Sequence, residues 1–155
     1  MKFEHKVRVE ASKEKVKAFL DDFTQASKCV PGVEDVRLIE QIELHDGVRV
    51  YEGKYRMRLG PLGFSFSGTA RVLPQENEDF WKLELQGRDP RIGAGAKGEL
   101  DAQFVAVSPT ATEVSMLADV TFTGRLAELG QPLIRRKADA MVKDFAENLR
   151  KALEN

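Results

Sequence analysis

The last thirty residues carry the pattern that most restricts the fold of this chain. Between Arg125 and Glu154, apolar residues recur mostly at intervals of three and four, which predicts one amphipathic helix. The apolar positions are Leu126, Leu129, Leu133, Ile134, Met141, Val142, Phe145, Leu149 and Leu153. At about 1.5 Å per residue such a helix would be roughly 45 Å long, so its apolar face needs an equally large covering surface. Either the regular helix begins near Pro132 or it kinks there.

The residues that precede this helix alternate between apolar and polar, which predicts strands. Residues 3–10 alternate strictly and form the first expected strand. A short helix with Ser12 as its N-cap follows, and a second short helix or turn is expected at 24–28. Pro31-Gly32 ends this segment, and from there to the long helix the period is two.

Six further strands are expected in one run of hairpins. They lie at 36–44, 51–59, 62–72, 81–85, 96–106 and 114–122. Glu40 falls on the apolar side of its strand and predicts a bulge, and Asp46-Gly47 predicts a hairpin turn. The sequence therefore predicts an α+β fold in one domain, 1–155. A seven-stranded antiparallel sheet curls around the C-terminal helix, with two short helices after the first strand.

Composition narrows the function classes. The 155 residues carry 24 basic and 25 acidic side chains, a formal charge of −1, which does not suggest a nucleic-acid partner. The one cysteine, Cys29, allows no intramolecular disulfide and is expected to be buried as a small apolar side chain. No apolar run has the length of a signal peptide core or of a membrane span. We expect a cytoplasmic protein, with peripheral contact at the inner membrane face as an open alternative.

Two short motifs have simpler explanations than catalysis. Residues 93–98 match the dinucleotide motif G-x-G-x-x-G, but that motif needs a helix after it and here alternation resumes at once. A strand start with small inward residues, which leave room beneath the sheet, is the favoured interpretation. Residues 12–15 match the S-x-x-K motif of some acyl enzymes, but its partner motifs are missing and Ser12 serves better as a helix cap.

The titratable residues give no metal or catalytic signature. His5 and His45 lie far from each other and from Cys29, so no metal site is predicted. His5 shares a face with apolar residues of the first strand, and a satisfied, half-buried histidine is favoured over a polar anchor for a ligand. We predict no catalytic residue.

Two basic clusters are expected on the surface. Lys54, Arg56 and Arg58 share the outer face of one strand, and residues 135–137 form a second cluster on the long helix. Solvated faces explain both clusters, and docking to an acidic partner or an anionic lipid is the sharper alternative.

The inward face of the predicted sheet and helix is the candidate ligand-binding site. Its large members are Tyr55, Met57, Leu59, Phe64, Phe66, Trp81, Leu83, Phe104, Phe122, Met141 and Phe145. Glycines and alanines lie among them, which favours an apolar cavity over a filled core. Its polar groups are few: the Tyr55 hydroxyl, the Trp81 indole N–H, and either His5 or Glu40. Such a set suits binding better than acid–base catalysis, which needs paired and perturbed groups.

Several short segments, in this order and spacing, resemble one family over nearly the whole chain. They are Cys29-Val30-Pro31-Gly32-Val33-Glu34, Leu59-Gly60-Pro61, Phe66-Ser67-Gly68, Gly93-Ala94-Gly95, Ala118-Asp119-Val120 and Gly124-Arg125-Leu126-Ala127-Glu128-Leu129-Gly130. The sequence resembles the CoxG-like family, which is named for the G subunit of carbon monoxide dehydrogenase. That family belongs to the helix-grip proteins, the START-like or Bet v 1-like group (SRPBCC superfamily).

The resemblance implies a non-catalytic accessory protein. Members are associated with molybdenum-containing dehydrogenases and are thought to connect the enzyme to the membrane, with a quinone or other isoprenoid-like lipid in the cavity. We therefore expect no covalent cofactor and a lipophilic ligand, either a quinone or a fatty-acid-like molecule. The expected partners are a molybdenum hydroxylase-type dehydrogenase and the membrane surface, and the oligomeric state stays open.

Two other functions remain open alternatives. A polyketide cyclase or dehydratase would use the same cavity and would depend on Tyr55, His5 and Glu40. An assembly factor with a filled core would act without a ligand. In the first hypothesis the long helix is a lid, in which Met141 and Phe145 close over the cavity. The lid would then bend near Gly130 and Pro132.

Overall fold

The computed structural model describes residues 1–42 and 47–154. Its elements are β1 (Lys2–Val9), α1 (Lys13–Asp21), α2 (Phe23–Ala26), η1 (Ser27–Cys29), β2 (Val33–Ile42), β3 (Val48–Leu59), β4 (Leu62–Leu73), β5 (Phe80–Asp89), β6 (Ala94–Ser108), β7 (Ala111–Gly124), η3 (Ala127–Leu129) and α3 (Gln131–Leu153). The strands form one antiparallel sheet in the order β1-β7-β6-β5-β4-β3-β2. The predicted fold is confirmed. The expected turn residue Asp46 and the end of the strand predicted at 36–44 lie outside the described residues.

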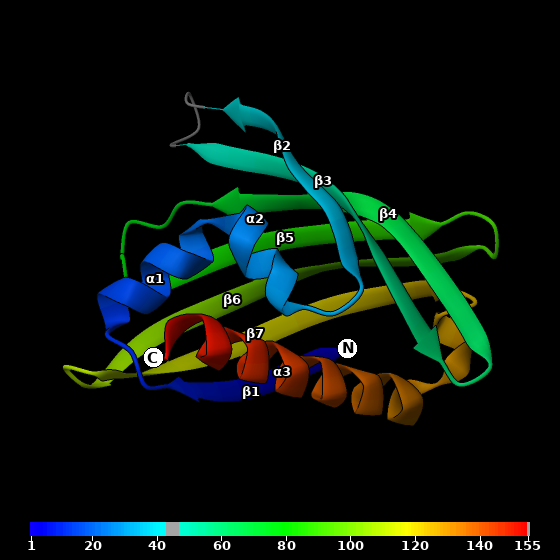
Figure 1. Cartoon of the computed structure of the whole chain (residues 1–155). Helices are drawn as coiled ribbons and strands as arrows, with labels where there is room; N and C mark the ends of the chain where they lie inside the picture. The colour runs from blue at the N-terminus through cyan, green and yellow to red at the C-terminus, as the bar shows by residue number, and fades with distance from the viewer. Residues whose placement is uncertain (43–46, 155) are drawn as a thin grey trace.

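Figure 1 shows how the sheet curls around the C-terminal helix. α3 runs along β1 on the concave side, and α1 and α2 lie near the C-terminal end of α3. The predicted cap of α1 is present, because the hydroxyl of Ser12 accepts a hydrogen bond from the backbone N–H of Lys15 at 3.2 Å. Val16 and Leu20 then face the core from one side of this short helix.

Three glycines lie side by side across the sheet, where its strands approach closely. Gly53 pairs with Gly68, and Gly68 pairs with Gly87, on β3, β4 and β5. A Cβ atom at Gly68 would collide with the carbonyl oxygen of Gln86 on the next strand. We expected small inward residues to leave room beneath the sheet. At Gly68 the missing side chain instead makes room for the backbone of the neighbouring strand. A strongly coiled sheet requires such close approach of its strands.

The C-terminal helix is shorter than the sequence pattern predicts. α3 has 23 residues, about 34 Å at 1.5 Å per residue, and the predicted start at Arg125 is wrong. The short turn η3 comes first, and Gly130 then adopts φ +87° and ψ 152°, a conformation essentially restricted to glycine. Pro132 lies in the first turn of α3, so the regular helix begins beside it and the alternative of a kink is wrong.

Candidate ligand-binding site

The apolar core is divided into three clusters rather than one continuous layer. The Leu149 cluster lies under α1 and the C-terminal half of α3: Val7, Val9, Ala11, Val16, Leu20, Ala26, Ala102, Phe104, Val114, Ala146, Leu149 and Leu153. The Leu126 cluster lies near the N-terminal end of α3: Leu59, Phe64, Phe66, Ala94 and Leu126. The Tyr51 cluster lies on the central strands: Tyr51, Ala70, Val72 and Leu83. The glycine row of β3, β4 and β5 separates the Leu126 cluster from the Tyr51 cluster.

The inner face between these clusters is not sealed. Leu85 pairs with Ala70 on one side and with Gly98 on the other, so its side chain lies on the inner face of β5. It is nevertheless 42% exposed. Met141 and Phe145, on the apolar stripe of α3, are only half-buried. Sheet and helix therefore leave apolar surface accessible between them, which is the condition for an apolar ligand to bind there.

The eleven predicted ligand-binding residues divide by exposure. Leu59, Phe64, Phe66, Leu83 and Phe104 are buried, so protein atoms already cover them. Tyr55, Met57, Trp81, Phe122, Met141 and Phe145 are half-buried and keep accessible surface. The half-buried six are the better candidates, and their contact with a ligand stays a prediction.

Tyr55 contributes a polar group to the inner face, and its environment changes its acidity. Burial, and secondarily the negative charge of Asp144 on α3, raise the pKa of Tyr55 to about 12. The phenol is therefore neutral at physiological pH and can donate a hydrogen bond. The influence of Asp144 also indicates that the Tyr55 side chain faces the helix.

The other two predicted polar groups do not join Tyr55. The Nε2 atom of His5 lies 3.6 Å from the Oδ1 atom of Asp139 on α3. His5 belongs to the edge strand β1, whereas Tyr55 belongs to β3, next to the other edge of the sheet. Glu40 pairs with Val50, next to the inward Tyr51, so it points to the outer face. The predicted bulge is present between Leu38 and Glu40, and it is this register shift that turns the carboxylate outward. The placement of Glu40 in the cavity is wrong.

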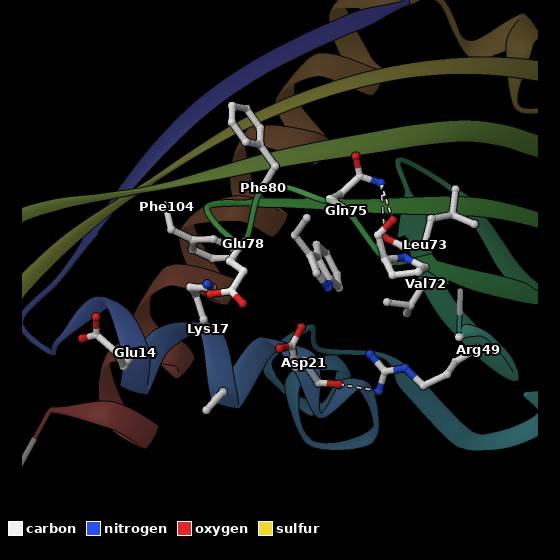
Figure 2. A pocket seen from close by; sticks show the side chains of 14 residues that line it. Glu14, Lys17, Asp21, Arg49, Val72, Leu73, Gln75, Glu78, Phe80 and Phe104 are labelled. Atoms are coloured by element: carbon white, nitrogen blue, oxygen red, sulfur yellow. Dashed lines mark hydrogen bonds between the residues drawn. The ribbon is translucent and has the colours of Figure 1, made fainter. Parts of the chain in front are cut away.

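A separate pocket of about 690 Å³ lies between α1 and the β4–β5 connection. Figure 2 shows Glu14, Lys17 and Asp21 of α1 along one side of it. The guanidinium of Arg49 donates a hydrogen bond to the carbonyl oxygen of Asp21 at 2.7 Å and closes one end. The spacing of these three residues in the sequence could have indicated that they share one face of α1. Only the structure shows which strands lie opposite that face.

Trp81 connects this pocket with the inner face. It lines the pocket and packs against both the Leu149 and the Tyr51 clusters, and Phe104 lines the pocket beside it. The Trp81 indole N–H is buried and has no hydrogen-bond partner among the described residues. An unpaired buried donor costs roughly 1–3 kcal/mol, so an acceptor that reached it would be stabilised.

The described residues contain no group of three His, Cys, Asp or Glu side chains that could hold a metal ion. After Gly93 the G-x-G-x-x-G segment enters strand β6 rather than a helix, so the pyrophosphate geometry of that motif is missing. Cys29 is buried as expected, and burial raises the pKa of its thiol. His45 lies outside the described residues.

The curled sheet around one C-terminal helix is the START-like, helix-grip fold, and several solved structures share it. A conserved protein from Geobacillus kaustophilus superposes with a TM-score of 0.79 at 17% identity, over 98% of this chain and 94% of that one. A START superfamily protein from Mycobacterium smegmatis gives 0.70 at 15% identity, over 99% and 97%. The Zhui aromatase/cyclase from Streptomyces sp. R1128 gives 0.66 at 16% identity, over 98% and 90%.

The family follows from the sequence itself. The profile of the CoxG family, named for the G subunit of carbon monoxide dehydrogenase, matches residues 6–154, so the chain belongs to that family. A comparison with curated protein sequences yields no match. Among the described residues, no helix combines the length and apolar character that crossing a membrane requires.

Proposed function

We propose that this protein is a non-catalytic accessory protein that binds a lipophilic small molecule, quinone-like or isoprenoid-like, on its inner face. The observation that carries the proposal is the exposure of Leu85 on the inner face of the central strand β5. A core that served only stability would cover such a residue, because each Å² of buried apolar surface contributes about 25 cal/mol. Membership of the CoxG family supports an accessory role.

The polar groups of the site suggest what the ligand carries. The neutral Tyr55 hydroxyl and the unpaired Trp81 N–H are both hydrogen-bond donors. A ligand that is mostly apolar and bears one or two carbonyl acceptors would satisfy them, and a quinone has this composition. A fatty-acid-like molecule would meet them with its carboxyl group.

The family name indicates the partner. We infer that the protein acts beside a molybdenum-containing carbon monoxide dehydrogenase or a related hydroxylase, in the cytoplasm and at the inner face of the membrane. In that role it would carry its ligand between the enzyme and the lipid phase.

Organic extraction of the purified protein, followed by mass spectrometry, tests the ligand. We expect a co-purifying isoprenoid or quinone, and a menaquinone analogue should raise the melting temperature. Leu85→Gln should weaken this stabilisation. Leu117→Gln is the matched control, since Leu117 is 54% exposed on the outer face, and it should leave the stabilisation unchanged. An empty extract together with no thermal shift would contradict quinone binding and favour the ligand-free assembly factor.

A cyclase or dehydratase is the second candidate, because the Zhui aromatase/cyclase shares this fold and the neutral Tyr55 hydroxyl could donate a hydrogen bond to a bound substrate. The separation of Tyr55, His5 and Glu40 argues against it, since acid–base catalysis needs groups within hydrogen-bond reach of one substrate. If a polyketide-type substrate is turned over, Tyr55→Phe should lower the rate sharply. An unchanged rate would remove this candidate.

A further inference from the structure

The outer face of the sheet carries a narrow trough with basic walls, which we call the β4 trough. Its floor is the outward side of β4, where the small residues Gly63, Ser65 and Ser67 succeed one another. On the β3 side these three residues pair with Arg58, Arg56 and Lys54, respectively. On the β5 side Ser67 pairs with Arg88, and Arg91 follows in the next turn.

Three of the five basic side chains, those of Arg56, Arg58 and Arg91, reach the floor. Arg56 and Arg91 line a pocket of about 400 Å³ together with Gly63, Phe64 and Ser65. The guanidinium of Arg58 lies over Gly63, where an added Cβ atom would be 3.3 Å from its Nη1 atom. Adjacent strands are about 4.8 Å apart, so the walls on β3 and β5 stand roughly 10 Å from each other. That width accepts one extended polypeptide chain.

The charge of the trough is not neutralised from within. Asp89 is buried beneath it and accepts hydrogen bonds from Arg91 at 2.9 Å and from the backbone N–H of Ser65 at 2.8 Å. These bonds, the one from Arg91 foremost, hold the pKa of the Asp89 carboxyl below its ordinary value. Glu34 lies 3.6 Å from Arg56, on the side of β2. Within the described residues, Asp89 and Glu34 therefore offset only part of the charge of the five basic side chains, and Glu52, the next outward carboxylate of β3, is already paired with Arg37.

We propose that the β4 trough docks an extended acidic segment of a protein partner. Same-face side chains of an extended chain repeat about every 6.8 Å. Acidic residues at alternate positions of a partner would therefore match the spacing of Arg58, Arg56 and Lys54. Four of the five basic residues are arginines, whose planar guanidinium groups bind carboxylates in pairs of hydrogen bonds.

A protein segment fits this trough better than a lipid surface does. Peripheral membrane sites usually combine basic residues with apolar side chains that enter the bilayer. Within the described part of the chain, the exposed large apolar residues lie away from the trough: Leu38, Ile39, Phe80, Leu85, Val105, Val107 and Leu117. The proposal does not depend on the ligand of the inner face, and either can fail without the other.

Fluorescence anisotropy with a labelled peptide of alternating Glu and Gly tests the proposal on the full chain. Binding should weaken with added salt, and the same peptide with Gln in place of Glu should not bind. Arg56→Glu with Arg88→Glu, one residue from each wall, should weaken binding roughly tenfold or more. The control, Arg136→Glu with Lys143→Glu on the exposed side of α3, makes the same charge change and should stay within about twofold.

The milder pair Arg56→Gln with Arg88→Gln repeats the test if the reversed charges impair folding, and melting temperatures show which variants are folded. Equal loss in the trough and control variants would reduce the effect to net charge and overturn the proposal. So would failure of the Glu peptide to bind. Trough-dependent binding to vesicles of phosphatidylcholine and phosphatidylglycerol, without peptide binding, would assign the surface to lipid and overturn it as well.

Discussion

The C-terminal half and the middle of α3 differ in how they meet the sheet, although one apolar stripe runs through both. In the C-terminal half, Ala146, Leu149 and Leu153 are buried within the Leu149 cluster. In the middle, Ala138 and Met141 are only half-buried. The middle of the helix therefore keeps more accessible surface than its C-terminal half, and this surface borders the proposed ligand site.

Hydrogen bonds strengthen the same contrast. The side-chain amide of Asn148 donates to the carbonyl oxygen of Cys29 at 3.0 Å, and Arg150 donates to that of Arg8 at 3.0 Å. Lys15 of α1 donates to the carbonyl oxygen of Leu153 at 2.9 Å. These bonds fix the C-terminal half to η1, β1 and α1. Any opening of α3 should therefore begin away from this end.

The largest expected effect comes from shortening one apolar side chain in each part of α3 to alanine. Leu149→Ala should lower the free energy of unfolding by about 2–5 kcal/mol, because Leu149 is 0% exposed and its removal leaves a cavity. Met141→Ala should cost about 1 kcal/mol, since Met141 already borders accessible space. Urea denaturation of both variants measures the difference. Equal losses would show that the middle of the helix is packed as tightly as its end.

Enlarging an alanine probes the same contrast from the opposite direction. Ala146→Leu should destabilise by about 1–3 kcal/mol, because Ala146 is 6% exposed and the added atoms have no room. Ala138→Leu, two turns earlier, should change stability by less than about 1 kcal/mol and should reduce ligand uptake by filling the site. Denaturation and the menaquinone thermal shift report the two effects. A strongly destabilised Ala138→Leu variant would argue against free space under the helix.

The predicted bend of the helix near Gly130 gives a third test. Gly130→Ala should destabilise by about 1–2 kcal/mol, because φ +87° with ψ 152° is strained for any residue with a Cβ atom. The sequence predicted a bend of the lid near Gly130, and the backbone shows that an added Cβ atom there would introduce strain. Gln131→Ala, one residue later in the first turn, is the control and should be nearly neutral in a urea titration. Equal midpoints for both variants would contradict a constrained Gly130.

The sequence predicted the architecture well because alternation and helical spacing depend on local chemistry. All seven strands and the cap at Ser12 are present. The start of α3 was wrong because Leu126 and Leu129 continue the helical spacing through the turn η3, although they pack there outside the regular helix. Pro132 indicated this boundary as one of two alternatives, and the positive φ of Gly130 in the folded backbone decides between them.

Pairing register explains what the sequence could not show about the sites. Glu40 was misplaced because the bulge between Leu38 and Glu40, although expected, changes the face of the sheet on which Glu40 lies, and the sequence did not show its exact position. The basic stripe of β3 was visible, but its opposite wall, Arg88 and Arg91, becomes a wall only through the pairing of β4 with β5. The half-exposure of Met141 likewise depends on which parts of the sheet α3 contacts, so a uniform apolar stripe did not reveal it.

The smallest expected effect concerns the ionisation of Tyr55, which lies on the proposed ligand-binding face. Its pKa in the folded chain is raised to about 12, whereas that of an unfolded tyrosine is about 10. Between these values the unfolded chain loses the proton and the folded chain keeps it, so Tyr55 makes stability fall as pH rises through this window. The loss should be on the order of 1 kcal/mol, because partial exposure weakens the effect of burial.

A pH titration of tyrosinate absorbance, taken as wild type minus Tyr55→Phe, isolates this group. Asp144→Asn should lower the pKa of Tyr55 slightly, since the charge of Asp144 is the lesser cause of the shift. A bound apolar ligand should raise it further, because it removes the remaining water from around the phenol. A titration that does not change with ligand would place the ligand away from β3, and the middle of α3 would then cover a site that the ligand does not use.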